Sequence, residues 1–184
     1  MINAIGFCNQ SVGVSFSPYS HGTFSDAAQV NLPFEQSLGA IYHIDMLNDG
    51  SVVESDYYRS SSPLKKRFMF TTITSPLDQN HPVSGNREFG IFANPNGDGY
   101  TFYIMGVDRQ SDWMFSLANA FNTSFDKADE LWSSIQRNMA NFIKNQGGVA
   151  TALSPVVARP KWDDVKDYLL GNISFPVLKN RLKC

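Results

Sequence analysis

The spacing of apolar residues changes once along the chain, and this change limits the folds that the chain can adopt. Up to about residue 110, apolar and aromatic residues come in short runs divided by turn sequences such as 48–50 and 94–99. Such runs are typical of strands, and short turns favour antiparallel neighbours. From residue 125 the apolar residues recur at intervals of three and four instead, which is typical of one helix face.

Five strands are predicted, over 38–47, 52–59, 66–74, 87–93 and 100–108. The helix has a continuous apolar face formed by Phe125, Ala128, Trp132, Ile135, Met139 and Phe142. Shorter helices are predicted over 112–121 and from residue 161 to about 170, and two further short strands fit 4–8 and 12–16.

These elements predict an α+β fold. A curved antiparallel sheet of about five to seven strands packs on a long C-terminal amphipathic helix, with one or two short extra helices. The length of 184 residues fits a single domain over 1–184, strand-rich over 1–110 and helical over 111–184.

The composition excludes several classes of protein. Only 17% of the residues are charged and the net charge is −2, so there is no excess of cations to bind nucleic acid. No apolar run is long enough for a transmembrane segment, and the first residues lack the basic and apolar regions of a signal peptide. We therefore expect a cytoplasmic protein, or one exported by a dedicated secretion system. Cys8 and Cys184 are either free or paired with each other.

Two polar clusters are candidates for catalysis. His81 and Arg87 lie in a stretch rich in hydrogen-bonding side chains, and Asp108 and Arg109 lie where the last strand gives way to helices. A histidine beside an arginine and a carboxylate is suited to acid–base chemistry with an anion clamp. The alternative is that the loop with His81 only pins the register of a strand, and that Asp108 and Arg109 only pair with neighbouring residues.

Metal and cofactor motifs are missing from the sequence. There is no His-x-x-x-His, Cys-x-x-Cys or glycine-rich phosphate loop, so neither a metal nor a cofactor is predicted. His43 lies in an alternating strand with the parity of Ile41 and Asp45, and is expected to face out or to pack at a sheet margin, in a structural role.

Aromatic residues are abundant in the predicted strands, at 13% of the whole chain. Most are expected in the core, but several strands are apolar on both faces, so part of this surface would line a cavity or meet a partner. The predicted ligand-binding residues are Phe70, Tyr103, Trp113 and Trp132.

Residues 66–146 resemble START-like helix-grip domains. The resemblance rests on the order Phe-Thr-Thr-Ile, His-Pro-Val-Ser-Gly-Asn-Arg-Glu-Phe-Gly-Ile, a glycine-rich hairpin, Tyr-Thr-Phe-Tyr, Val-Asp-Arg and a long helix. It implies a bent sheet that wraps a helix around an apolar pocket. The composition, which is rich in Asn and Ser and poor in charge, also resembles that of the C-terminal modules of secreted bacterial effectors and Rhs-type toxins. Neither resemblance implies a catalytic residue.

Three functions follow as hypotheses. The first is a ligand-binding domain of a bacterial exported or effector-type protein, which holds an apolar or lipid-like molecule between sheet and helix. The second is an enzymatic effector or toxin domain that uses His81, Arg87, Asp108 and Arg109. The third is a protein-interaction or immunity module. The expected partners are a small apolar molecule or another protein, and the expected state is a monomer or weak dimer.

Overall fold

The computed structural model describes residues 15–33, 35–45, 49–61, 64–81, 83–110, 121–158 and 161–182, with the backbone alone for 110, 121–128 and 162. Residues 112–120 of the predicted helix over 112–121, the strand at 4–8, Trp113, Cys8 and Cys184 lie outside these residues. The chain divides into two compact units, Met1–Ala152 and Leu153–Cys184, which are described separately. A single domain over 1–184 stays a prediction.

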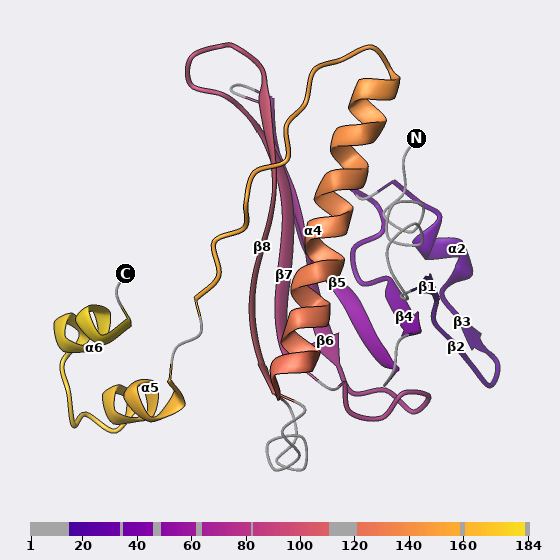
Figure 1. Cartoon of the computed structure of the whole chain (residues 1–184). Coiled ribbons are helices and arrows are strands. Elements are labelled where there is room, and N and C mark those ends of the chain that lie inside the picture. The colour runs from indigo at the N-terminus through magenta and orange to yellow at the C-terminus, as the bar shows by residue number, and fades with distance from the viewer. Residues whose placement is uncertain are drawn as a thin grey trace. The chain divides into compact units, whose positions relative to one another are not determined.

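The first unit contains a six-stranded antiparallel sheet in the order β1-β4-β5-β6-β7-β8 (Figure 1). A two-stranded hairpin and the short helix α2 lie between β1 and β4 in the sequence. The fold is therefore α+β, as predicted. The strands are β1 (Ser15–Pro18), β2 (Ser20–His21), β3 (Phe24–Ser25), β4 (Ile41–Asp45), β5 (Gly50–Ser61), β6 (Leu64–Ile73), β7 (Val83–Ala93) and β8 (Tyr100–Gln110), and α2 is Ala27–Val30.

The β7–β8 hairpin shows how the turn sequence positions the strands. Its turn is closed by the Asn94 amide, which donates to the Gly99 carbonyl at 2.9 Å. Gly97 has a φ of 72°, a left-handed conformation that glycine adopts without steric cost. β7 begins at Val83, earlier than predicted, because 83–86 pair with the end of β8.

The sheet has two faces because side chains alternate along each strand. We call the face that carries Phe70 and Phe89 the core face, and the one that carries His43 and Tyr103 the second face. Buried hydrophobic side chains of the core face include Phe16, Tyr42, Ile44, Val52, Phe70 and Phe89, each at most 5% exposed. A register shift in β5 between Glu54 and Asp56 changes the alternation, so Tyr57 rather than Asp56 continues the core face.

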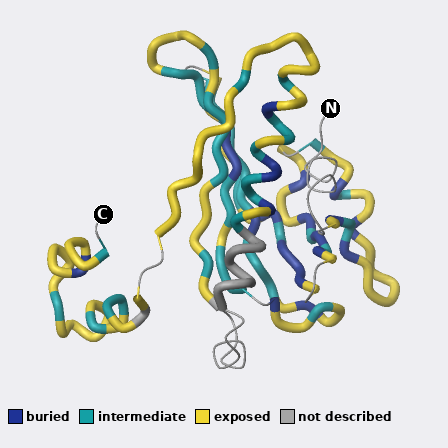
Figure 2. Tube along the Cα trace, in the orientation of Figure 1, coloured by how far each residue is buried: buried dark blue, intermediate teal, exposed yellow. Residues whose placement is uncertain are grey.

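Helix α4 (Phe121–Asn145) has 25 residues and lies along the core face of the sheet (Figure 1). Leu131 and Ile135 join the buried cluster, and the ring of Trp132 lies 5.8 Å from that of Phe89. Buried positions lie along α4 and the strands that face it (Figure 2). Phe142, predicted on the apolar face, is 38% exposed near the end of the helix.

The second unit contains two helices, α5 (Trp162–Leu169) and α6 (Phe175–Leu182). Arg181 of α6 donates to Asp164 of α5 at 2.7 Å, and the rings of Tyr168 and Phe175 are 5.9 Å apart. α5 lies within the range predicted from residue 161, whereas α6 was not predicted. Among the helices described, none is both long and apolar enough to cross a membrane.

Candidate functional site

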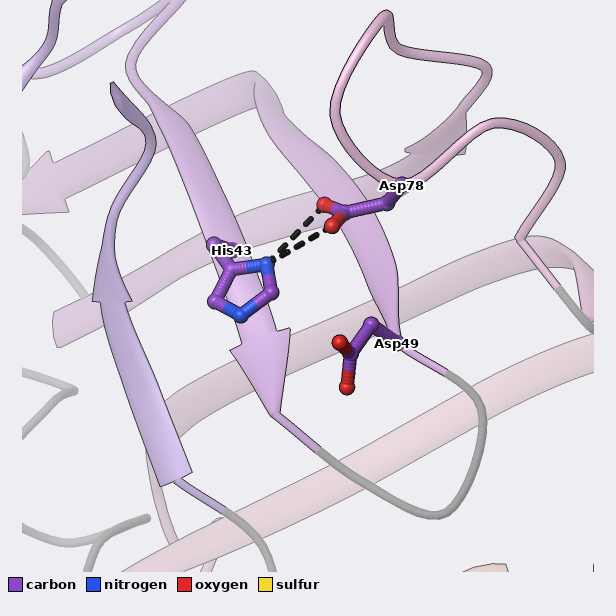
Figure 3. A group of neighbouring side chains, drawn as sticks. All are labelled: His43, Asp49 and Asp78. Atoms are coloured by element: carbon purple, nitrogen blue, oxygen red, sulfur yellow. Dashed lines mark hydrogen bonds and ion pairs between the residues drawn. The ribbon is translucent and has the colours of Figure 1, made fainter. Parts of the chain in front are cut away.

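Three side chains from separate segments meet on the second face, beside the β4–β5 pair. They are His43 of β4, Asp49 just before β5, and Asp78 of the loop between β6 and β7. One potential ligand atom from each lies within 4.8 Å of the other two. Figure 3 shows the Asp78 carboxylate directed at the His43 ring, with Asp49 beside them.

His43 is positioned by the pairing of β4 with its neighbours. Tyr42 and Ile44 on either side are buried in the core, so alternation turns His43 to the second face, opposite Ser51 of β5. Its side chain is 20% exposed. The predicted parity of His43 is therefore confirmed. Its side chain also contacts a residue from a distant loop, Asp78.

Asp78 is held in place by a small closed loop. Ser75 and Gln79 exchange two backbone hydrogen bonds, of 3.0 and 2.8 Å, and the Asp78 amide donates to the Ser75 hydroxyl at 3.0 Å. The Ser51 hydroxyl donates to the Asp78 carboxylate and lies 2.9 Å from the Ser75 hydroxyl. Only 2% of the Asp78 side chain is exposed, so this carboxylate is fixed from two sides.

The contact between His43 and Asp78 is close and bifurcated, because one ring nitrogen lies near both carboxylate oxygens. The His43 Nδ1 lies 2.9 Å from one Asp78 oxygen and 3.0 Å from the other. In the neutral ring a proton on Nδ1 is donated to the carboxylate, and Nε2 remains an acceptor. Asp49 is exposed, so the cluster can be reached from solvent.

This set of donors suits a divalent metal ion. Imidazole nitrogen and carboxylate oxygen together bind borderline ions such as Zn²⁺ and Mn²⁺. A separation of 2.9 Å is also what two ligands have at a right angle on one ion with bonds of about 2.1 Å. An ion could therefore replace the proton between His43 and Asp78.

The four predicted catalytic residues are only partly brought together. Arg87 and Asp108 form an ion pair on the core face, and the Arg87 guanidinium lies 4.5 Å from the centre of the Trp132 ring. Gly106 makes this possible, since a Cβ there would lie 2.2 Å from the Arg87 Cζ. Burial lowers the pKa of Arg87, and the neighbouring Asp108 opposes that effect.

The other two predicted catalytic residues have surroundings of their own. Arg109 follows Asp108 in the strand, so its side chain turns to the second face, where it is exposed. His81 is buried against Gly50, and its Nδ1 accepts a hydrogen bond from the Val83 amide at 3.2 Å. Burial lowers the pKa of His81.

The predicted ligand-binding residues do not share one surface. Phe70 and Trp132 both lie on the core-face side, where Phe70 packs on Phe89 with ring centres 5.8 Å apart. Tyr103 lies on the second face and donates a hydrogen bond to Glu88. The fourth residue, Trp113, lies outside the described part.

The cluster of His43, Asp49 and Asp78 was not predicted from the sequence. His43 and Asp49 are close in sequence across a predicted turn, and that spacing is the one local signal that could have linked them. Asp78 is 35 residues from His43 and reaches it only through the fold. A scan against protein-family models, a search of curated proteins and a search of solved structures found no match to this chain.

Proposed function

We propose that this chain binds a divalent transition-metal ion through His43, Asp49 and Asp78. The observation that carries the proposal is the convergence of one imidazole and two carboxylates within 4.8 Å, from three separate segments. The Ser51 and Ser75 hydroxyls support Asp78 from behind, as partners of metal ligands commonly do.

The protein would occupy only part of the coordination sphere of the ion. His43 Nδ1 and one oxygen from each aspartate supply three ligands, and the remaining positions are open to water. Three protein ligands with an open position are typical of catalytic rather than structural metal sites. The group available for chemistry is then a metal-bound water, which suits hydrolysis.

Isothermal titration calorimetry tests this proposal. The chain is stripped with a chelator and titrated with ZnCl₂ and, separately, with MnCl₂ at pH 7.5. We expect one equivalent to bind to the unaltered protein. His43→Ala, Asp49→Asn and Asp78→Asn should each weaken binding by at least about 10-fold, since each removes a ligand.

Asp45→Asn is the matched control. Asp45 is an exposed carboxylate two positions along β4 from His43, and it lies 3.5 Å from the Ser15 hydroxyl rather than in the cluster. This variant should bind the ion like the unaltered protein. The proposal would be contradicted if all four variants bound the ion equally well. It would also be contradicted if neither the unaltered protein nor any variant bound it.

A second function, acid–base catalysis by His43, is favoured by the bifurcated contact of Asp78 with the His43 Nδ1. This contact orients the ring as in enzymes where a carboxylate holds a catalytic histidine and leaves Nε2 to act as a base. If neither ion binds, acylation of His43 by diethyl pyrocarbonate, followed by peptide mass mapping, tests this alternative. Asp78→Asn should slow the reaction, and an unchanged rate would exclude it.

The functions inferred from composition and resemblance remain predictions. They are the binding of an apolar molecule, the activity of an effector or toxin domain, and the role of an interaction or immunity module. The metal site is compatible with the second of these, and it uses different residues from those that the sequence predicted.

A further inference from the structure

Glu54 carries a carboxyl group that is completely buried in the core. It lies on β5, pairs in register with the buried Phe70 of β6, and has 0% of its surface exposed. It faces the core because it lies two positions after the buried Val52, and the register shift of β5 comes only after Glu54. A carboxyl group in such a place is costly to ionise unless nearby groups compensate the charge.

The hydrogen bonds of Glu54 fit the neutral acid better than the carboxylate. The Ser37 hydroxyl donates to Oε2 at 2.6 Å, and Ser37 is itself fully buried. The other oxygen, Oε1, has no hydrogen-bond partner within the described part of the chain. An ionised carboxylate has about four acceptor positions, and a single donor leaves most of them empty.

The groups packed around Glu54 provide no compensating cation among the described residues. Its cross-strand partner on β6 is Phe70, and on its other side its backbone is bonded to Ala40. Both residues belong to the hydrophobic cluster to which α4 contributes Leu131 and Ile135. The titratable groups of this region are Tyr57 and Glu35, and Arg59 lies 3.9 Å from Glu35 with both side chains about half exposed. Burial accordingly raises the pKa of Glu54 to about 7, against the opposing effect of the Ser37 hydrogen bond.

Glu54 also holds the segment that leads into β4. Its carbonyl accepts from the Gly39 amide at 2.8 Å, and its own amide donates to the Ala40 carbonyl at 2.9 Å. Together with the Ser37 hydrogen bond, these contacts fasten residues 37–40 to β5. Any loosening caused by a charge on Glu54 would therefore act first on this segment.

We propose that Glu54 is a proton-dependent latch, which holds residues 37–40 on β5 while its carboxyl is neutral and releases them when it ionises. This inference is independent of the proposed metal site. If the opened segment exposes Glu54 to water, ionisation favours opening. Between pH 5.5 and 8.5 the opening equilibrium should rise by about 30-fold, from a pKa of 4.5 in the open state and about 7 in the closed state.

Amide hydrogen exchange on the full chain tests the latch. Rates for the Gly39 and Glu54 amides are measured by NMR between pH 5.5 and 8.5 and corrected for the intrinsic pH dependence of exchange. Protection of both amides should fall by about 30-fold in the unaltered protein. In Glu54→Gln, which has the same shape and no charge, protection should not depend on pH.

Glu35→Gln is the matched control, because it removes an exposed carboxylate two residues before Ser37. It should keep the fall seen in the unaltered protein. Constant protection in the unaltered protein, or an equal fall in Glu54→Gln, would overturn the proposal. If Glu54→Gln does not fold, the carboxyl carbon of Glu54 is titrated directly: a midpoint near 7 supports the latch and one near 4.5 overturns it.

Discussion

At the scale of single residues, several of the few charged side chains of this chain form defined ion pairs. Only 17% of its residues are charged, yet Arg67 of β6 contacts both Asp56 at 2.9 Å and Glu88 at 2.8 Å on the second face. Arg87 and Asp108 are paired on the core face. Such pairs contribute to stability according to their burial, since exposed pairs are screened by water.

The pair of Arg87 and Asp108 gives the first prediction. Their side chains are 17% and 19% exposed, so removing one charge leaves the other poorly solvated. Asp108→Asn should lower the free energy of unfolding by about 2 kcal/mol, measured by urea denaturation. Arg109→Gln, at the exposed neighbouring position, should change it by less than about 0.5 kcal/mol. Equal effects of the two variants would show that the pair does not stabilise the fold.

Tyr103 gives a second prediction, on pH. Burial and the hydrogen bond to Glu88 raise the pKa of the Tyr103 phenol to about 12. The folded state therefore prefers the neutral phenol, and it loses stability as the pH rises from about 10 to about 12. The difference in ultraviolet absorbance between the protein and Tyr103→Phe should show a titration midpoint near 12. A midpoint near 10 would contradict this account of Tyr103.

At the scale of elements, periodicity predicted the type of most of them, and their ends less well. All five predicted strands exist, but β5, β6 and β7 begin earlier, because pairing with a neighbour extends a strand beyond its apolar run. The register shift after Glu54 has no local signal, since it depends on the pairing of β5 with β6. The apolar spacing after residue 125 lies within α4, where packing against the sheet decides which positions are buried.

The burial along α4 gives a third prediction. Ile135 is 2% exposed and lies in the core cluster, whereas Phe142 on the same predicted face is 38% exposed. Ile135→Ala should lower the free energy of unfolding by about 3 kcal/mol because it leaves a cavity. Phe142→Ala should cost less than about 1 kcal/mol in the same urea denaturation experiment. A larger effect of Phe142→Ala than of Ile135→Ala would place the contact between helix and sheet elsewhere.

At the scale of the whole molecule, the candidate site depends on contacts between distant parts of the chain. The sequence predicted that His43 would face away from the core, because alternation in a strand is local. It did not predict Asp78 as its partner, because the loop that holds Asp78 is shaped by the Ser75–Gln79 bridge and by Ser51 of another strand. The predicted catalytic residues likewise do not form one site, because Asp108 and Arg109 are successive residues of one strand and face opposite sides of the sheet.

The division of the chain gives a fourth prediction. Residues 1–152 contain the whole sheet, α4 and the candidate site. A chain that ends at Ala152 should therefore keep the thermal midpoint of the full chain within about 2 °C, measured by circular dichroism. A large fall in the midpoint would show that residues 153–184 stabilise the sheet and that the chain is one folding domain.

The metal site is the central claim, and an anomalous difference map tests it most directly. Crystals of the full chain are grown with ZnCl₂, and data are collected on both sides of the zinc absorption edge. We expect the strongest peak between His43, Asp49 and Asp78, about 2.0–2.2 Å from the His43 Nδ1 and from one oxygen of each aspartate. No peak at these residues, with the His43–Asp78 hydrogen bond still in place, would contradict the account.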